Sequence, residues 1–132
     1  METDTAAAAK VHEYYDLSRA YLKSAQISLE HGLYEPAMFT AIHALELALK
    51  AALLTKSPDA WKTHNVGGQF GRYFRGELGE DLCRRVNILL ARYNLPRYPS
   101  EAPVDPSSVR QDIAFIEEFI KDVGVLLKRN LS

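Results

Sequence analysis

With 132 residues, of which 47% are hydrophobic and 25% charged, the chain is long enough for one globular domain and too apolar for wholesale disorder. Its net charge of −1 neither requires nor excludes a polyanionic partner, and its single cysteine, Cys83, excludes an intrachain disulfide. The acidic N-terminus lacks the basic start of a signal peptide, and no apolar run approaches the about 20 residues of a membrane span. We therefore expect a cytoplasmic protein that makes no contact with a membrane.

The first expected helix covers about residues 6–31, with Asp4 or Thr5 as its N-cap and Gly32 after its end. Four apolar side chains recur along it at helical spacing: Tyr14, Leu17, Tyr21 and Ala25.

The second expected helix covers about residues 35–55, and Pro36 suits its first turn because the missing N–H costs nothing there. One apolar line runs along it, made of Met38, Ile42, Leu45, Leu49 and Ala52. A loop containing Trp61 should follow.

Two shorter helices are expected over about residues 67–75 and 79–94, the first of them broken by Gly76 and Gly79. Residues 95–106 carry four prolines and predict an extended loop, because neither a helix nor a central strand tolerates that density.

The last expected helix covers about residues 107–130, with a start signal at Asp105-Pro106 or at Ser107 and Ser108. Its apolar stripe steps by four and three residues: Val109, Ile113, Ile116, Ile120, Val123 and Leu127. No segment alternates with a period of two. The sequence therefore predicts an all-α fold, an up-and-down antiparallel bundle of four or five helices in a single domain over residues 1–132.

Charged side chains interrupt the second helix, which is apolar on nearly every side. Glu46 and Lys50 are four residues apart in the order that favours an ion pair, and His43 lies on the same stripe. These residues fit a narrow solvent-facing strip, a partly buried pair that sets helix register or a subunit interface, or a catalytic carboxylate and base. Apolar residues on both flanks favour a homodimer as well as an intrachain core.

Positive charge is concentrated in residues 62–98, which contain seven basic and three acidic residues, a balance of +4, whereas the rest has nine against fourteen, a balance of −5. All but one of the seven are arginines, whose planar fork matches phosphate oxygens. Five aromatic residues lie among them: Phe70, Tyr73, Phe74, Tyr93 and Tyr98. Arginines with aromatic rings suit a phosphate-bearing, base-stacking ligand, and an arginine-rich solvated face is the alternative.

Other catalytic and cofactor motifs are missing from the sequence. The four histidines show no metal-ligand spacing, and one cysteine cannot build a Cys-rich zinc site. No phosphate-binding glycine loop and no Gly-x-Ser-x-Gly occurs. We expect no metal and no cofactor. His64, just before the third expected helix, is a cap, a core group or an acid–base residue.

Three stretches together resemble the HEPN family of prokaryotic helical-bundle proteins. They are 39–54, with Ala44-x-Glu46-x-x-x-Lys50-x-x-Leu53 inside it, Thr63-His64-Asn65-Val66, and 93–99, whose Arg97-Tyr98-Pro99 is similar to the Arg-Tyr-Pro loop after the family's fourth helix. The resemblance covers about residues 10–128. It implies a helical bundle that is usually a homodimer, with a role in nucleotide or RNA biology. It also implies, in many members, a partner minimal nucleotidyltransferase, as in toxin–antitoxin pairs.

Some members of that family are metal-independent ribonucleases whose signature is an arginine followed four to six positions later by a histidine. In this chain neither Arg92 nor Arg97 has a histidine in that window. Since general acid–base cleavage of RNA needs a group that moves a proton near neutral pH, we assign no catalytic residue and expect no enzyme activity.

The leading hypothesis is thus a homodimeric interaction module that binds a nucleotide, an RNA or a nucleotidyltransferase partner. Its candidate ligand-binding residues are Arg92, Arg97, Tyr98 and His64, and its candidate interface or buried polar residues are His43, Glu46 and Lys50. The alternative is a ribonuclease toxin with a degenerate motif.

Overall fold

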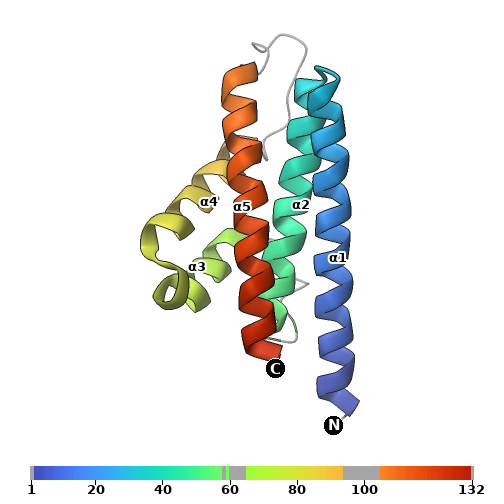
Figure 1. The fold of residues 1–132 in the computed structure, drawn as a ribbon. Coiled ribbons are helices and arrows are strands. Elements are labelled where there is room, and N and C mark those ends of the chain that lie inside the picture. The colour runs from blue at the N-terminus through green and yellow to red at the C-terminus, as the bar shows by residue number, and fades with distance from the viewer. Residues whose placement is uncertain (1, 58, 60–64, 94–104, 132) are drawn as a thin grey trace.

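Five α-helices and no strand make up the part of the chain that the computed structural model describes, residues 2–57, 59, 65–93 and 105–131 (Figure 1). In chain order the helices are α1 (Glu2–Glu30), α2 (Tyr34–Leu54), α3 (Val66–Leu78), α4 (Glu80–Tyr93) and α5 (Pro106–Leu131). The predicted all-α class is confirmed, and each of the five expected helices is present.

The three long helices lie side by side, with α1 antiparallel to both α2 and α5 (Figure 1). The shorter α3 and α4 pack against each other and lie on one side of the long helices, inclined to them. The chain therefore forms the predicted helical bundle, with a short inclined helix pair between its second and last long helices.

Helix α2 is the centre of the core. The predicted line of Met38, Ile42, Leu45, Leu49 and Ala52 is buried throughout. A second buried line consists entirely of alanines: Ala37, Ala41, Ala44, Ala48 and Ala51. The hydroxyl of Ser18 in α1, itself fully buried, donates a 2.7 Å hydrogen bond to the carbonyl oxygen of Ala44. The small side chains of this line let the α1 and α2 backbones approach closely enough for that bond.

Helix α5 covers another side of α2, and its predicted apolar stripe is buried at all six positions. Asp105 caps it, since its carboxyl oxygen accepts hydrogen bonds from the backbone N–H of Ser108, at 3.1 Å, and from the Ser108 hydroxyl, at 3.0 Å. The ring of Phe119 meets the edge of the Phe70 ring from α3 at 5.5 Å between centroids. This contact joins the inclined pair to the long helices.

Two expected helix ends were wrong. Helix α1 begins at Glu2, so Asp4 and Thr5 lie within the helix and are not its N-cap. Helix α3 runs through Gly76 to Leu78 and ends at Gly79, whose φ of +92° is a conformation that favours glycine.

The buried face of α1 also differs from the apolar line in the sequence. Val11, Ser18, Leu22 and Ala25 face the core, whereas Leu17 and Tyr21 are exposed. Because Leu17 and Tyr21 are apolar but lie outside the core of this chain, they are free to contact something else.

Helix α2 has the length and mean hydropathy of a membrane span, judged by composition alone. However, 72% of that apolar window is buried inside the fold. Burial in the core of the bundle accounts for its apolar character.

Gly124 marks a close approach between α1 and α5. A Cβ atom at this position would collide with the hydroxyl of Tyr15, which donates a 3.1 Å hydrogen bond to the carbonyl oxygen of Ile120. The lack of a side chain at Gly124 therefore leaves the space that the Tyr15 hydroxyl occupies.

We predict that Gly124→Ala lowers the free energy of unfolding by about 1–3 kcal/mol, the usual cost of overpacking, as measured by urea denaturation. Gly76→Ala is the matched control: Gly76 lies in a helix with open space around its Cβ position, so it should gain about 0.5–1 kcal/mol. If the two substitutions changed the free energy of unfolding equally, the steric role assigned to the Tyr15–Gly124 contact would be contradicted.

Candidate functional site

Arg92 is the predicted ligand-binding residue that the structure describes, and it lies in a small polar cluster at the end of α4. Its Nη1 atom is 3.5 Å from Oδ2 of Asp112 in α5. The hydroxyl of Tyr93 donates a 2.6 Å hydrogen bond to the same oxygen. Asp112 is one of the few buried polar residues of the described chain, and these two neighbours explain how its carboxyl group is tolerated there.

Arg92 and Asp112 differ in how much of each side chain is exposed to solvent. The Arg92 side chain is 53% exposed, whereas that of Asp112 is 11% exposed. Burial, together with the hydrogen bond to Asp112 and the charge of that residue, raises the pKa of the Tyr93 hydroxyl above its usual value, while Arg92 acts in the opposite direction. Tyr93 therefore keeps its proton and serves as a hydrogen-bond donor, and Arg92 presents part of its guanidinium to solvent.

The other predicted ligand-binding residues, Arg97, Tyr98 and His64, lie outside the described residues. Their grouping with Arg92 stays a prediction.

The arginines of α3 and α4 are exposed, as a binding surface requires, but most of their aromatic neighbours are not. Phe70 and Phe74 are fully buried core residues, and Tyr93 is buried against Asp112. Their expected role as stacking platforms was therefore wrong, and Tyr73 is the exposed ring among the described members of that set. The arginines themselves also have neighbours within the chain, for example Arg85, which lies 4.1 Å above the centre of the Phe115 ring.

A second candidate site is a strip on one side of α1 and α2, here called the α1–α2 face. Its α1 members recur at helical spacing, as do its α2 members, and the rings of Tyr21 and His43 meet edge to face at 4.6 Å between centroids, which joins the two rows. The face consists of Tyr14, Leu17 and Tyr21 from α1 and Phe39, His43, Glu46 and Lys50 from α2.

All three predicted interface residues thus lie on one face. His43 is exposed, and Glu46 and Lys50 are half-buried. Glu46 and Lys50 form no ion pair with each other despite their favourable spacing. Both charges therefore remain available to a partner.

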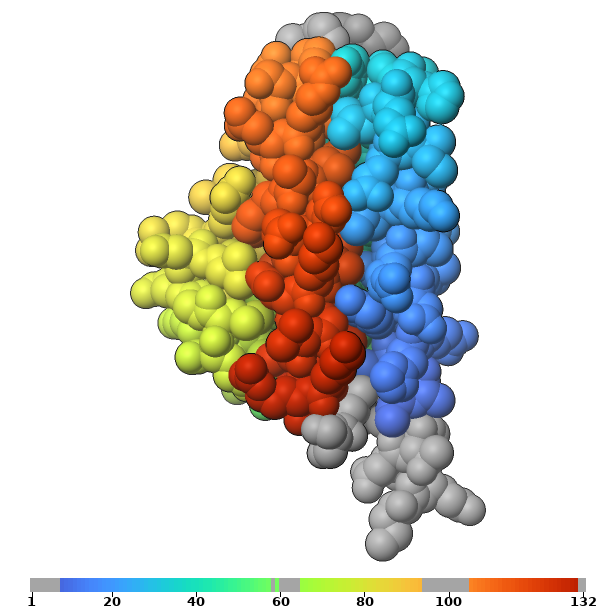
Figure 2. Space-filling view, viewed as in Figure 1, coloured from blue at the N-terminus to red at the C-terminus, as the bar shows by residue number. Residues whose placement is uncertain are grey.

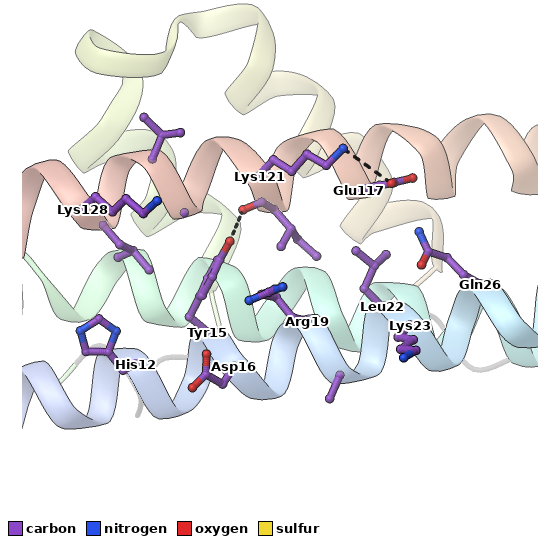
Figure 3. A pocket seen from close by; sticks show the side chains of 15 residues that line it. His12, Tyr15, Asp16, Arg19, Leu22, Lys23, Gln26, Glu117, Lys121 and Lys128 are labelled. Atoms are coloured by element: carbon purple, nitrogen blue, oxygen red, sulfur yellow. Dashed lines mark hydrogen bonds and ion pairs between the residues drawn. The ribbon is translucent and has the colours of Figure 1, made fainter.

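A groove between α1 and α5 is the third candidate site, and sequence analysis missed it. It has a volume of about 1230 Å³ and runs along α1 from His12 to Gln26 and along α5 from Glu117 to Lys128. Figure 2 shows α1 and α5 next to each other at the surface, and Figure 3 shows the side chains that line the groove between them. Its two walls come from opposite ends of the chain, so no local sequence pattern marks it.

No group of three metal-ligating side chains occurs among the residues with described positions. Cys83 is buried, as expected, and burial raises the pKa of its thiol, with Arg75 acting in the opposite direction. A buried thiol with a raised pKa is a poor nucleophile.

A comparison with protein families finds a match to the model described as HEPN domain over residues 11–128. Neither the curated proteins nor the solved structures contain a significant match to the chain. The family match agrees with the resemblance of the motifs and with the order of the helices.

We predict that Tyr93→Phe lowers the free energy of unfolding by about 1–3 kcal/mol, because the buried Asp112 carboxyl group loses its closest hydrogen-bond donor. Urea denaturation measures the effect. Tyr73→Phe is the control, since Tyr73 is exposed on α3, and it should change stability by less than about 0.5 kcal/mol. A Tyr93→Phe protein as stable as the original would show that Asp112 does not depend on this bond.

Proposed function

The chain belongs to the HEPN family, and from that premise we propose that it is a non-catalytic interaction module that acts as a homodimer in the cytoplasm. The observation that carries the proposal is the α1–α2 face. It combines exposed apolar side chains with two charged groups that have no ion-pair partner among the described residues.

The apolar part of the face has the character of an interface. Leu17 is 45% exposed and Phe39 is 47% exposed, and Tyr21 lies between them with its ring against His43. Exposed apolar side chains with polar groups beside them are typical of protein–protein contacts. Covering this face would remove the Leu17 and Tyr21 side chains of α1 from water.

The charged part of the face suits a contact between two identical copies. In a twofold-symmetric contact, a residue that lies off the axis meets a different residue of the other protomer, so Glu46 of one copy can pair with Lys50 of its partner. Such a pair would use the two charges that do not bond to each other within the chain.

The surface proposed for the ligand is the end of α4, where the partly exposed Arg92 guanidinium provides a positive charge. We expect Arg97, Tyr98 and His64 to join it and to bind a phosphate-bearing nucleotide or RNA, or an acidic surface of a nucleotidyltransferase partner in a toxin–antitoxin-type pair. The positive balance of residues 62–98 supports an anionic ligand.

A second candidate function, a metal-independent ribonuclease with a degenerate motif, is favoured by one observation. His43 is exposed on the α1–α2 face, so dimerisation would bring two imidazole side chains toward one interface. Imidazole is the group most often used in general acid–base catalysis.

We predict that the Leu17→Asp, Phe39→Asp double variant is a monomer at concentrations where the original protein is a dimer, because a dimer would bury both introduced charges. Sedimentation velocity distinguishes 14.9 kDa from twice that mass. The matched control is Ile88→Asp, since Ile88 in α4 is 48% exposed but lies outside the face. A monomeric original protein, or a double variant that still forms dimers, would contradict the proposal.

We predict that Arg92→Ala and Arg97→Ala each weaken binding of ATP, GTP or a short RNA by about tenfold at low salt, and that the affinity of the original protein falls as salt is added. Arg84→Ala is the control, because Arg84 pairs with Asp81 on an exposed part of α4. Titrations that show no binding of any of the three ligands would reject nucleotide binding and leave the protein partner as the proposed ligand.

Incubating the same samples with total RNA in the absence of metal tests the ribonuclease hypothesis. Cleavage that is lost on His43→Ala would favour that hypothesis over the non-catalytic module.

A further inference from the structure

The α1–α5 groove is separate from the α1–α2 face. At about 100° per residue, the α1 side chains that line the groove, such as Arg19 and Lys23, point away from the opposite side of the helix, where Leu17 and Tyr21 lie. The groove is therefore a surface that the proposed dimer contact does not use.

The groove carries more positive than negative charge, although the chain as a whole is slightly acidic. Its lining includes four basic residues and two acidic ones, a balance of +2, whereas the whole chain has a net charge of −1. The basic residues are Arg19, Lys23, Lys121 and Lys128, and the acidic ones are Asp16 and Glu117. Both walls contribute cations, two from α1 and two from α5.

Most of these cations have no acidic partner. Lys121 lies 3.7 Å from Glu117 and 3.4 Å from Glu118. By contrast, Arg19, Lys23 and Lys128 form no ion pair with any carboxylate in the described ranges of the chain. In Figure 3 the Arg19 side chain lies between the α1 and α5 ribbons. These three cations fit an anionic partner.

Between the charged walls the groove is apolar. Leu22, Ile120 and Leu127 are buried beneath it, and Val125 lies at its edge with 57% of its surface exposed. An occupant that matches this lining has apolar side chains along one face and acidic side chains beside them.

The length of the groove indicates the kind of occupant. From His12 to Gln26, α1 rises about 21 Å, which is the length of a helix of about 14 residues. The volume of about 1230 Å³ is above the range of about 300–1000 Å³ that is usual for a small-molecule pocket. An extended partner fits this shape better than a single nucleotide does.

The lining also argues against a nucleic acid. Among the lining residues that the structure describes, Tyr15 has the one phenol ring and His12 the one imidazole, and the hydroxyl of Tyr15 is bonded to the backbone of α5. Stacked bases need aromatic platforms, and this lining offers few of them.

We propose that the α1–α5 groove binds an acidic amphipathic helix of a partner protein, with its apolar face over Leu22 and Val125 and its carboxylates toward Arg19, Lys23 and Lys128. This proposal goes beyond the proposed function, since it adds a second contact surface that does not depend on whether the chain forms dimers.

The test is selection from a displayed library of 16-residue helical peptides, with leucines fixed along one face and the flanking positions randomised, against the full chain. The expected result is enrichment of Asp and Glu at the flanking positions. Measured by fluorescence anisotropy, selected peptides should bind about tenfold more weakly to the Arg19→Glu, Lys128→Glu double variant and to Val125→Asp.

Arg72→Glu with Arg84→Glu is the control, because it reverses two exposed arginines on α3 and α4, outside the groove, and should leave peptide affinity unchanged. Circular dichroism verifies that every variant is folded. No enrichment, enrichment of basic peptides, or equal binding to the groove and control variants would overturn the proposal. So would a 12-nucleotide RNA whose binding is lost in the groove variants while no peptide binds. Sedimentation of the same variants tests the dimer separately, so failure of one proposal is distinguishable from failure of the other.

Discussion

The constraint on which this fold depends is that α2 is apolar around most of its circumference and must be covered on several sides at once. Its leucine-rich line and its alanine line are both buried, and α1, α5 and the inclined α3 and α4 provide the cover. The alanine line lets a neighbour come close, as the bond from Ser18 to the Ala44 carbonyl shows. What α2 leaves uncovered is the narrow strip that contains Phe39, His43, Glu46 and Lys50.

Helix α1 connects this core to both candidate contact surfaces. One side, with Val11 and Leu22, is in the core, and the sides flanking it carry the apolar row of the α1–α2 face and the cations of the groove. Close packing on α2 fixes the helix, while its contact with α5 is sparser and depends on Tyr15 lying over Gly124. The closer packing of α1 on α2 and its sparser contact with α5 explain why the groove lies between α1 and α5.

Periodicity predicted the helices and the buried faces of α2 and α5, because a stripe at 3.6-residue spacing reports directly on burial. It failed on α1, where the row of Leu17 and Tyr21 is as regular as the row that faces the core. It also assigned Phe70 and Phe74 to a ligand surface, because composition around arginines does not reveal which way a ring points. Periodicity did not identify the family. The resemblance of three motifs to HEPN proteins did, and the family match over residues 11–128 confirms it.

The candidate sites were harder to predict than the fold. His43, Glu46 and Lys50 were recognisable as charges in an apolar helix. Asp112 was not, because an aspartate next to an apolar stripe has the ordinary appearance of a surface residue, and only the contact with Tyr93 from α4 shows its burial. The groove joins residues about a hundred positions apart, such as Tyr15 and Ile120, so its existence depends on tertiary pairing.

The placement of the groove and the α1–α2 face on opposite sides of α1 has a consequence for valency. Two copies joined through the α1–α2 face would each keep a groove directed outward, which makes the assembly bivalent without any additional surface. A partner that is itself dimeric, or that carries two acidic helices on a linker of suitable reach, would engage both grooves at once. Its avidity could then exceed the affinity of a single groove by about 10²–10⁴-fold, and that gain would disappear when the two copies separate.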